Sequence, residues 1–222
     1  MTNPTFSVSR YMEAHRRLAL ELDMAAFQRG IDVIRSTFLS GHLVVTCGNG
    51  GSASTASHYI TDWTKSGSMA TGKHMRGISL VDNIGLVTAF GNDVGYDEVF
   101  AGQVRSLVEA GDLLVAVSGS GNSPNVLKAV RAAHEVGADT LAIVGYDGGE
   151  LMKIARRSVW VPSFDMQLCE DLHLMFGHMV MKSLCGGTIV HAVDVAAQRS
   201  GSVPAEAGIF CEASSMASLT RL

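Results

Sequence analysis

Apolar residues along this chain of 222 residues gather in short runs, separated by stretches with helical spacing. Five runs carry few charges, which is typical of strands that a parallel sheet buries on both faces. These runs are residues 42–47, 77–81, 113–117, 141–144 and 158–161. The alternation of strands and helices predicts an α/β fold, a doubly wound three-layer sandwich with a five-stranded parallel sheet and N-terminal helices.

Helical spacing of apolar residues marks the segments between and around these runs. The predicted helices cover residues 52–65, 84–90, 99–109, 123–136, 150–156 and 168–184. Residues 1–40 are also predicted to be helical, with a break at Gly30 and a stop at Gly41. Their long, weakly charged pattern suits packing between subunits, and it suits core packing within one subunit equally well.

We therefore expect three segments along the chain. Residues 1–40 form a helical segment that joins subunits, and residues 41–185 form the α/β domain. Residues 186–222 form a C-terminal tail rich in Gly, Ser and Ala, for which the sequence gives no assignment.

The composition limits the classes of function. Only 17% of the residues are charged, against roughly 25% in typical soluble domains, so the chain has a large core or buries surface against copies of itself. The 17 basic and 21 acidic residues give a net charge of −4, which argues against a nucleic-acid partner.

No apolar run approaches the ~18 residues of a membrane span. The first residues lack a signal-peptide pattern, and the four cysteines lack CxxC spacing. We expect a cytoplasmic homo-oligomer without a membrane or nucleic-acid partner.

Two loops rich in Gly and Ser follow the first and third predicted strands. The first reads CGNGGSAS (47–54) and the second reads SGSGNSP (118–124). Glycines let the backbone approach a ligand, and the following helix directs free N–H groups at it. Neither loop contains the GxGxxG pattern or the lysine of a P-loop. Each loop alone is an ordinary strand-to-helix turn with a Ser cap. Two such loops at one edge of an open sheet predict a crevice that binds a phosphate monoester.

Four side chains on two predicted helices have the chemistry of metal ligands or proton carriers. His58 and Asp62 are four residues apart and share a helix face, and Glu170 and His178 are two turns apart on the last helix. Two imidazoles and two carboxylates suit a divalent metal such as zinc. His173 is a spare candidate. A lone histidine is more often a core or solvated residue, but four such groups beside the two loops favour a functional site.

The chain resembles the sugar isomerase (SIS) domains and, more narrowly, the phosphoheptose isomerases. The resemblance lies in CGNGGSASTASHYITDW (47–63), GISLVD (77–82), AFGNDVGYDEVF (89–100), EAGDLLVAVSGSGNSPNVLKAV (109–130), VGYDGGEL (144–151) and the segment from VPS (161–163) to His178. It implies an SIS fold and a sugar-phosphate-binding domain over residues 41–185, and the helical start also fits the family.

The resemblance also implies roles for individual residues. Phosphate-binding positions correspond to Ser52, Ser118, Ser120 and Ser123, and substrate contacts to Asn49, Gly50, Asn92 and Asp93. The family joins a His and a Glu on the first helix with a Gln and a His on the last helix, and some members bind zinc with these four. The matching residues here are His58, Asp62, Glu170 and His178, so Glu has become Asp and Gln has become Glu.

The implied activity is an aldose–ketose isomerase that interconverts sedoheptulose 7-phosphate and heptose 7-phosphate, assembled as a homotetramer. Isomerisation moves a proton between adjacent carbons through an enediol, while an acid or a metal polarises the carbonyl oxygen. We predict that Asp62 or Glu170 shares the proton transfers with His178. The metal ligands are predicted to be His58, Asp62, Glu170 and His178.

Two other functions stay open. A non-catalytic phosphosugar-binding or protein-association factor is similar to a branch of the family that contains a replication-initiation factor. That branch also has an alanine after the loop serine, as at Ala53, and resembles this chain around VGYDGGEL (144–151). It lacks the histidine on the last helix that is present here as His178, and this difference favours the enzyme. A sugar-phosphate sensor with an altered site is the third hypothesis, which the exchanges at Asp62 and Glu170 leave open. The sequence does not identify the exact sugar.

Overall fold

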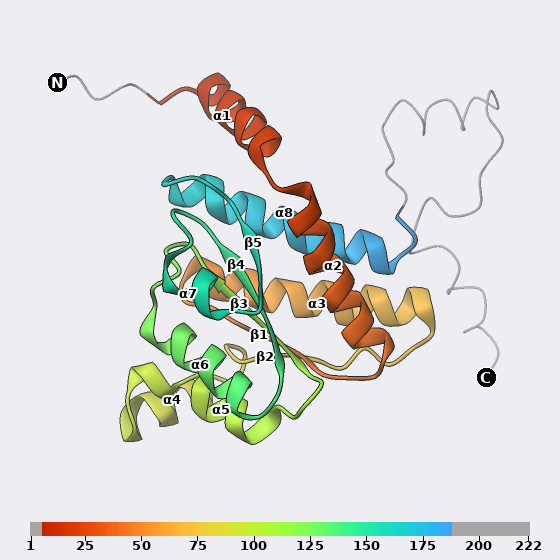
Figure 1. Cartoon of the computed structure of the whole chain (residues 1–222), viewed down its shortest axis with the longest axis vertical. Helices are drawn as coiled ribbons and strands as arrows, with labels where there is room; N and C mark the ends of the chain where they lie inside the picture. The colour runs from red at the N-terminus through yellow and green to blue at the C-terminus, as the bar shows by residue number, and fades with distance from the viewer. Residues whose placement is uncertain (1–5, 188–222) are drawn as a thin grey trace.

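A parallel sheet forms the centre of the molecule in the computed structural model, which describes residues 6–187 (Figure 1). Its strands are β1 (Val44–Cys47), β2 (Gly77–Ser79), β3 (Leu113–Ser118), β4 (Asp139–Val144) and β5 (Arg157–Trp160). They lie in the order β2-β1-β3-β4-β5, and every neighbouring pair is parallel. Each predicted apolar run overlaps one strand, so the five-stranded parallel sheet is confirmed.

The three central strands, β1, β3 and β4, are buried along almost their whole length because both faces of the sheet are covered, whereas the edge strands β2 and β5 are partly exposed. In β3, Leu113, Val115 and Val117 face one apolar core, while Leu114 and Ala116 face a second core. Since successive side chains of a strand point to opposite faces, this alternation places one core on each side of the sheet. The three-layer sandwich follows directly from it.

Helices cover both faces of the sheet (Figure 1). One layer contains α2 (Met24–Leu39), α3 (Gly51–Thr71) and α8 (Met166–Leu184). The other contains α5 (Ala101–Leu107), α6 (Pro124–Glu135) and α7 (Gly149–Ile154). Two further helices bury little: α1 (Val8–Glu21) buries Leu18, and α4 (Ile84–Asp93) buries no residue. The short 3-10 helix η1 (Tyr96–Glu98) lies between α4 and α5 in the chain.

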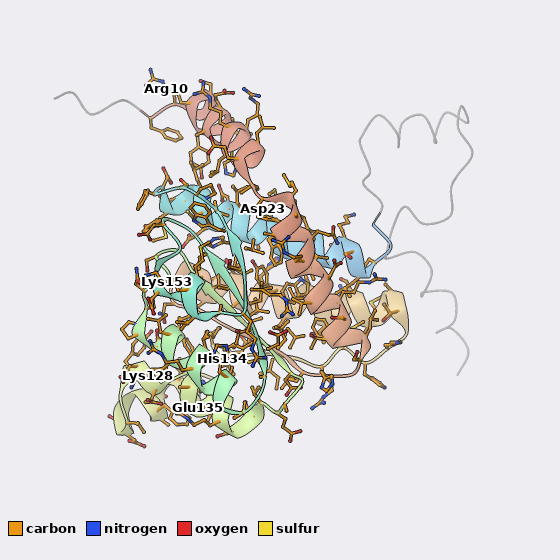
Figure 2. The ribbon with its side chains drawn as sticks, in the orientation of Figure 1. Arg10, Asp23, Lys128, His134, Glu135 and Lys153 are labelled. Atoms are coloured by element: carbon orange, nitrogen blue, oxygen red, sulfur yellow. The ribbon has the colours of Figure 1, made fainter. Side chains whose placement is uncertain are left out.

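The break between the first two helices is not at Gly30, so that prediction was wrong. Asp23 separates them and caps α2, because its carboxylate accepts hydrogen bonds from the N–H groups of Ala25 and Ala26 (Figure 2). Gly30 lies inside α2, where an added Cβ would lie 2.9 Å from a methyl group of Val159. A glycine there allows α2 to pack closely on β5. The stop at Gly41 is confirmed, since α2 ends at Leu39 and Gly41 has φ of +79°.

The first 40 residues contribute to the core of this chain through α2. Its inward face buries Phe27, Ile31, Ile34 and Phe38. Core packing within one subunit, one of the two interpretations of this segment, therefore holds for α2. Residues 188–222 of the predicted tail lie outside the described residues. Between residues 6 and 187, no helix combines the length and the apolar character that crossing a membrane requires.

Candidate active site

The two predicted loops flank the point where the chain reverses its direction across the sheet. β1 and β3 are neighbours, and the connection from β1 leads outward to β2 before the chain returns to β3. Crevices for ligands form at such switch points, at the carboxyl ends of the strands. The loop after β1 and the loop after β3 therefore meet at the edge of the sheet where a ligand is expected.

Glycines shape the first loop so that its backbone faces the crevice. Gly50 has φ of +55° and precedes α3 without a side-chain cap. An added Cβ on Gly48 would lie 2.7 Å from the carbonyl oxygen of Ser52. No side chain caps the start of α3, so the N–H groups of its first turn are available to an anion, although the Glu170 carboxylate lies beside Gly51.

The second loop directs hydroxyl groups into the same space. The Ser118 hydroxyl oxygen accepts a hydrogen bond from the Gly121 N–H (3.1 Å), and the Ser120 hydroxyl oxygen accepts one from the Asn122 N–H (3.3 Å). Each hydroxyl oxygen is thus held by its own loop, and its proton remains available to a ligand. Ser123 precedes α6 at the N-cap position, with Pro124 as the first helical residue.

Both loops line one cavity of about 300 Å³, which we call the loop cavity. Its lining residues are Asn49, Gly50, Gly51, Ser52, Val117, Ser118, Gly119, Ser120, Ser123, Met166 and Glu170. The structure thus brings together all four serines that the sequence predicted to bind phosphate.

Asn49 joins the two halves of the loop cavity. Its side-chain amide exchanges two hydrogen bonds with the amide of Asn125 (2.8 and 2.9 Å), and the Tyr96 hydroxyl also donates to Asn49 Oδ1 (3.1 Å). Both lone pairs of Asn49 Oδ1 are therefore used, and one N–H of its amide is left for a substrate. Sequence reasoning missed Asn125 and Tyr96. The segment GNSPN carries Asn125 next to the second loop, and that position was the available signal.

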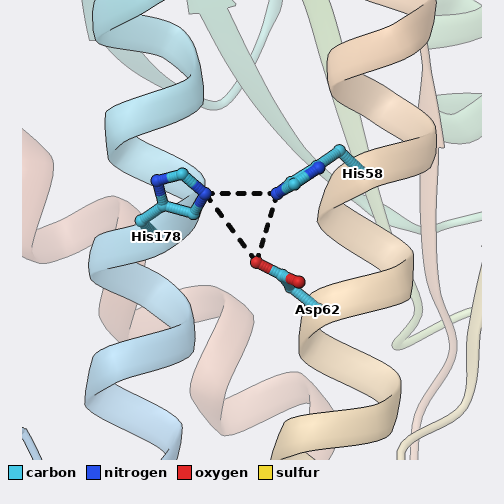
Figure 3. Close-up of side chains that lie close together, drawn as sticks. All are labelled: His58, Asp62 and His178. Atoms are coloured by element: carbon cyan, nitrogen blue, oxygen red, sulfur yellow. Dashed lines mark hydrogen bonds and ion pairs between the residues drawn. The ribbon is translucent and has the colours of Figure 1, made fainter.

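A second group of predicted residues meets between α3 and α8. His58 Nε2 lies 3.1 Å from His178 Nε2 and 3.2 Å from Asp62 Oδ2, and His178 Nε2 lies 3.9 Å from Asp62 Oδ2 (Figure 3). We call these three side chains the His–Asp cluster. They are between 27% and 48% exposed, so a small molecule can reach them.

Aromatic packing between the helices places the His–Asp cluster. Tyr59 and Trp63 stack on each other on the inner face of α3 and are fully buried. The Tyr59 hydroxyl donates to the carbonyl oxygen of His173 (2.5 Å), and Trp63 Nε1 donates to that of Gly177 (2.9 Å). Gly177 permits this approach, since an added Cβ would lie 2.2 Å from the Tyr59 ring. These contacts hold α3 and α8 together, so that His58 and Asp62 on α3 face His178 on α8.

The His–Asp cluster fits a divalent metal by its donor set. One atom from each of His58, Asp62 and His178 lies within 4.8 Å of the other two. Two imidazole nitrogens and one carboxylate oxygen form a ligand set that zinc accepts in catalytic sites, with a further position left for water or substrate.

Glu170 does not join this cluster. It lines the loop cavity instead, and an added Cβ on Gly51 would lie 2.2 Å from Glu170 Oε1. Eight residues of helix separate Glu170 from His178 by about 12 Å along the α8 axis, which is the physical reason for the difference. The spacing predicted a shared face correctly but not a shared ligand site.

Three further predicted residues lie apart from both sites. Asn92 and Asp93 end α4, where the Asn92 amide donates to Asp93 Oδ1 (2.7 Å). Within the part of the chain that the structure describes, neither lines the loop cavity or joins the His–Asp cluster. His173, the spare candidate, is 1% exposed, and burial lowers its pKa to about 4. It is a neutral core residue.

Comparisons with known proteins agree with this architecture. A family model described as SIS domain matches residues 10–145. The chain is 35% identical over 162 residues to the phosphoheptose isomerase of Aliarcobacter butzleri, which covers 72% of this chain and 85% of that relative. The solved phosphoheptose isomerase from Neisseria gonorrhoeae has a TM-score of 0.72 at 30% identity, and the match covers 80% of this chain and 96% of that one. A phosphoheptose isomerase from Francisella tularensis has a TM-score of 0.74 at 27% identity, covering 80% and 95% respectively. The chain therefore belongs to the SIS domain family, among the phosphoheptose isomerases.

Proposed function

We propose that this protein is an aldose–ketose isomerase that interconverts sedoheptulose 7-phosphate and a heptose 7-phosphate. The observation that carries the proposal is the placement of two sites on the same pair of helices. Glu170 and the loop cavity lie beside the start of α3, and the His–Asp cluster lies two turns further along α3 and α8. Similarity to proteins named phosphoheptose isomerase supports this class of substrate.

The loop cavity is the proposed phosphate site. The phosphate oxygens accept hydrogen bonds from the hydroxyls of Ser118, Ser120 and Ser123 and from the N–H groups at the start of α3. Ser52 and Gly50 line the same cavity and are included among the proposed phosphate-binding residues. The sugar chain then extends along α3 and α8, past Glu170, to the His–Asp cluster. The remaining N–H of the Asn49 side-chain amide donates a hydrogen bond to the substrate. Asn92 and Asp93 stay predictions from the family resemblance, because they contact neither site in the described chain.

The proton transfers are assigned to Asp62 and His178. A base takes a proton from the carbon next to the carbonyl group and returns it to the adjacent carbon, which requires hydrogen-bond reach at each step. Asp62 directs Oδ2 into the cluster, so Oδ1 remains to act as the base. His178 exchanges a proton with the sugar oxygen, and Glu170 accepts hydrogen bonds from the sugar hydroxyls. The binding energy of the remote phosphate holds the reacting carbons in place.

His58, Asp62 and His178 would hold a divalent metal, with zinc the best match for their donor set. Such an ion would take the place of the proton at His178 Nε2, the atom that faces the cluster, and when bound it would supply Lewis-acid polarisation of the carbonyl oxygen in the place of that proton.

The protein is also proposed to act as a homo-oligomer, a tetramer by family resemblance. Apolar side chains left exposed on α1 and α4 support this, including Val8, Met12, Leu20 and Ile84, which are 62–75% exposed. Light scattering of the purified protein measures the assembly, and a monomer would contradict this part of the proposal.

The test of the activity is an isomerisation assay on sedoheptulose 7-phosphate, before and after chelation and with zinc added back. We expect His178→Ala to lower kcat by at least ~100-fold, because it removes both a proton carrier and a cluster ligand. Chelation is expected to reduce turnover, and zinc to restore it.

The matched control is His74→Ala, since His74 is an exposed histidine outside both sites. Its kcat should equal that of the wild type. Full turnover by His178→Ala would show the assignment to be wrong. A wild type that binds the sugar phosphate but does not convert it would favour the hypothesis of a sugar-phosphate sensor instead.

A further inference from the structure

A third loop, residues 145–149 after β4, takes an unusual backbone path next to the loop cavity. The sequence alone suggests an ordinary turn at Asp147-Gly148-Gly149. In the structure, Tyr146 has φ of +46° and is the one non-glycine residue with positive φ between residues 6 and 187. Gly148 and Gly149 follow with φ of +83° and +56°. Such a conformation persists only where surrounding contacts hold it.

Hydrogen bonds attach this segment to the second serine loop. The Gly145 N–H donates to the Gly119 carbonyl oxygen (3.0 Å), and the Leu151 N–H donates to that of Gly121 (2.8 Å). The Glu150 N–H donates to Asn122 Oδ1 (3.0 Å). Since the Asn122 amide also donates to the Ser120 carbonyl oxygen (3.0 Å), its side chain joins both loops.

The two loops also touch backbone to backbone. An added Cβ on Gly149 would lie 2.4 Å from the Ser120 carbonyl oxygen, and one on Gly121 would lie 2.1 Å from the Gly148 carbonyl oxygen. No side chain fits at either position unless the loops move apart. Glycine is therefore required on both sides of the contact.

The strained residue extends this attachment to the start of α8. The Tyr146 ring stacks on Phe164, and its hydroxyl contacts the sulfur of Met166, which lines the loop cavity. Trp160 Nε1 donates to the Tyr146 carbonyl oxygen (3.0 Å). The third loop thus contacts the cavity from two sides, through the second loop and through Met166.

We propose that residues 145–151 are a brace that holds the second loop in its phosphate-binding conformation, with Gly149 and Asn122 as positioning residues. The inference rests on the proposed function, because it assigns phosphate to the loop cavity. That cavity offers neutral donors and no lysine, so its affinity depends on donors that are aligned before the ligand arrives.

Gly149→Ala tests the brace against Gly41→Ala as the matched control. Both glycines have positive φ, but an added Cβ on Gly41 meets no atom within 4 Å. Both variants are expected to lose thermal stability from backbone strain, and Gly149→Ala is expected to lose more because its added Cβ also overlaps the Ser120 carbonyl oxygen. Titration calorimetry with inorganic phosphate should show at least about tenfold weaker binding for Gly149→Ala alone. KM for sedoheptulose 7-phosphate should rise with it, while kcat stays within about twofold.

Asn122→Ala provides a second variant that leaves the backbone unstrained, in case Gly149→Ala fails to fold. It should weaken phosphate binding in the same direction. Equal phosphate affinity in the wild type, Gly149→Ala and Asn122→Ala would overturn the brace, and so would a wild type that binds no phosphate. If both variants bind phosphate more weakly than the wild type, but the wild type does not isomerise the sugar, the brace is supported and the proposed function is contradicted.

Discussion

The carboxylate of Glu170 lies in the same cavity as the hydroxyls that we propose to bind phosphate. Like charges at short range repel each other, most strongly where little water lies between them. The family resemblance places a glutamine at this position. Residue 170 is therefore expected to set how tightly the loop cavity binds a dianion.

We predict that Glu170→Gln binds inorganic phosphate about three- to tenfold more tightly than the wild type, because one negative charge is removed from the cavity. Titration calorimetry measures this directly. Glu109→Gln, which removes an exposed carboxylate outside the cavity, serves as the control and should leave the affinity unchanged. Weaker binding by Glu170→Gln would show that the carboxylate supports the phosphate site.

Some of the site could be predicted from single residues and their spacing. Positions four apart on a helix lie on neighbouring turns of one face, which is how His58 and Asp62 come together. The contact of both with His178 depends on how α3 packs on α8, and no periodicity encodes that. Pairing between Asn49 and Asn125 was missed for the same reason, since it joins loops that are distant in sequence.

At the scale of elements, the contact between α3 and α8 determines the geometry of the His–Asp cluster. Tyr59 and Trp63 on α3 donate hydrogen bonds to carbonyl groups of α8, and Gly177 removes the side chain that would separate the helices. His178 follows Gly177 directly. Any change in this spacing therefore displaces the cluster.

Gly177→Ala is expected to lower the free energy of unfolding by about 1–3 kcal/mol, because its methyl group overlaps the Tyr59 ring. We also expect kcat to fall by at least ~10-fold, since the shift displaces His178 from its partners. Urea denaturation and the isomerisation assay measure the two effects. Gly91→Ala on α4 is the control, because its added Cβ meets only a methyl group of Val99, at 3.7 Å. Equal behaviour of the two variants would contradict this account of the helix contact.

Burial of His173 in α8 predicts a loss of stability in mild acid. Its pKa is about 4 in the folded protein and 6.5 ordinarily, so the unfolded chain takes up the proton first as the pH falls. The contribution is complete above pH ~6.5 and is lost progressively toward pH ~4, with about 2 kcal/mol lost at pH 5. Urea denaturation at pH 7 and pH 5 measures it. His173→Leu should lose less stability between these pH values than the wild type or His74→Leu. If His173→Leu lost as much stability between pH 7 and pH 5 as the wild type, His173 would not titrate in this way.

The central strands β1, β3 and β4 were predictable because a strand buried on both faces leaves a continuous apolar run. The position of the first helix break was not, because Gly30 serves close packing in α2 and a polar residue, Asp23, ends the preceding helix. Glycine marks either a break or a close contact, and only the tertiary structure distinguishes the two.

In the whole molecule, the loop cavity lies at the carboxyl ends of β1 and β3, and the His–Asp cluster lies between α3 and α8, two turns from it. Strand order fixes the loop cavity at the switch point between β1 and β3. The helices α3 and α8, which pack on one face of the sheet, carry the His–Asp cluster. The apolar residues exposed on α1 and α4 form the surface that we propose for contact with copies of the chain. We propose that a sugar phosphate bound in the loop cavity exchanges a carbon-bound proton at the His–Asp cluster.

The most direct measurement is NMR spectroscopy of sedoheptulose 7-phosphate incubated with the protein in D₂O. The cluster is partly exposed, so the proton on its base exchanges with solvent. We predict that an aldose 7-phosphate forms with deuterium at C2 and that the remaining ketose gains deuterium at C1, with neither signal for Asp62→Asn. A ketose that the wild type binds but leaves free of deuterium, with no aldose formed, would contradict it.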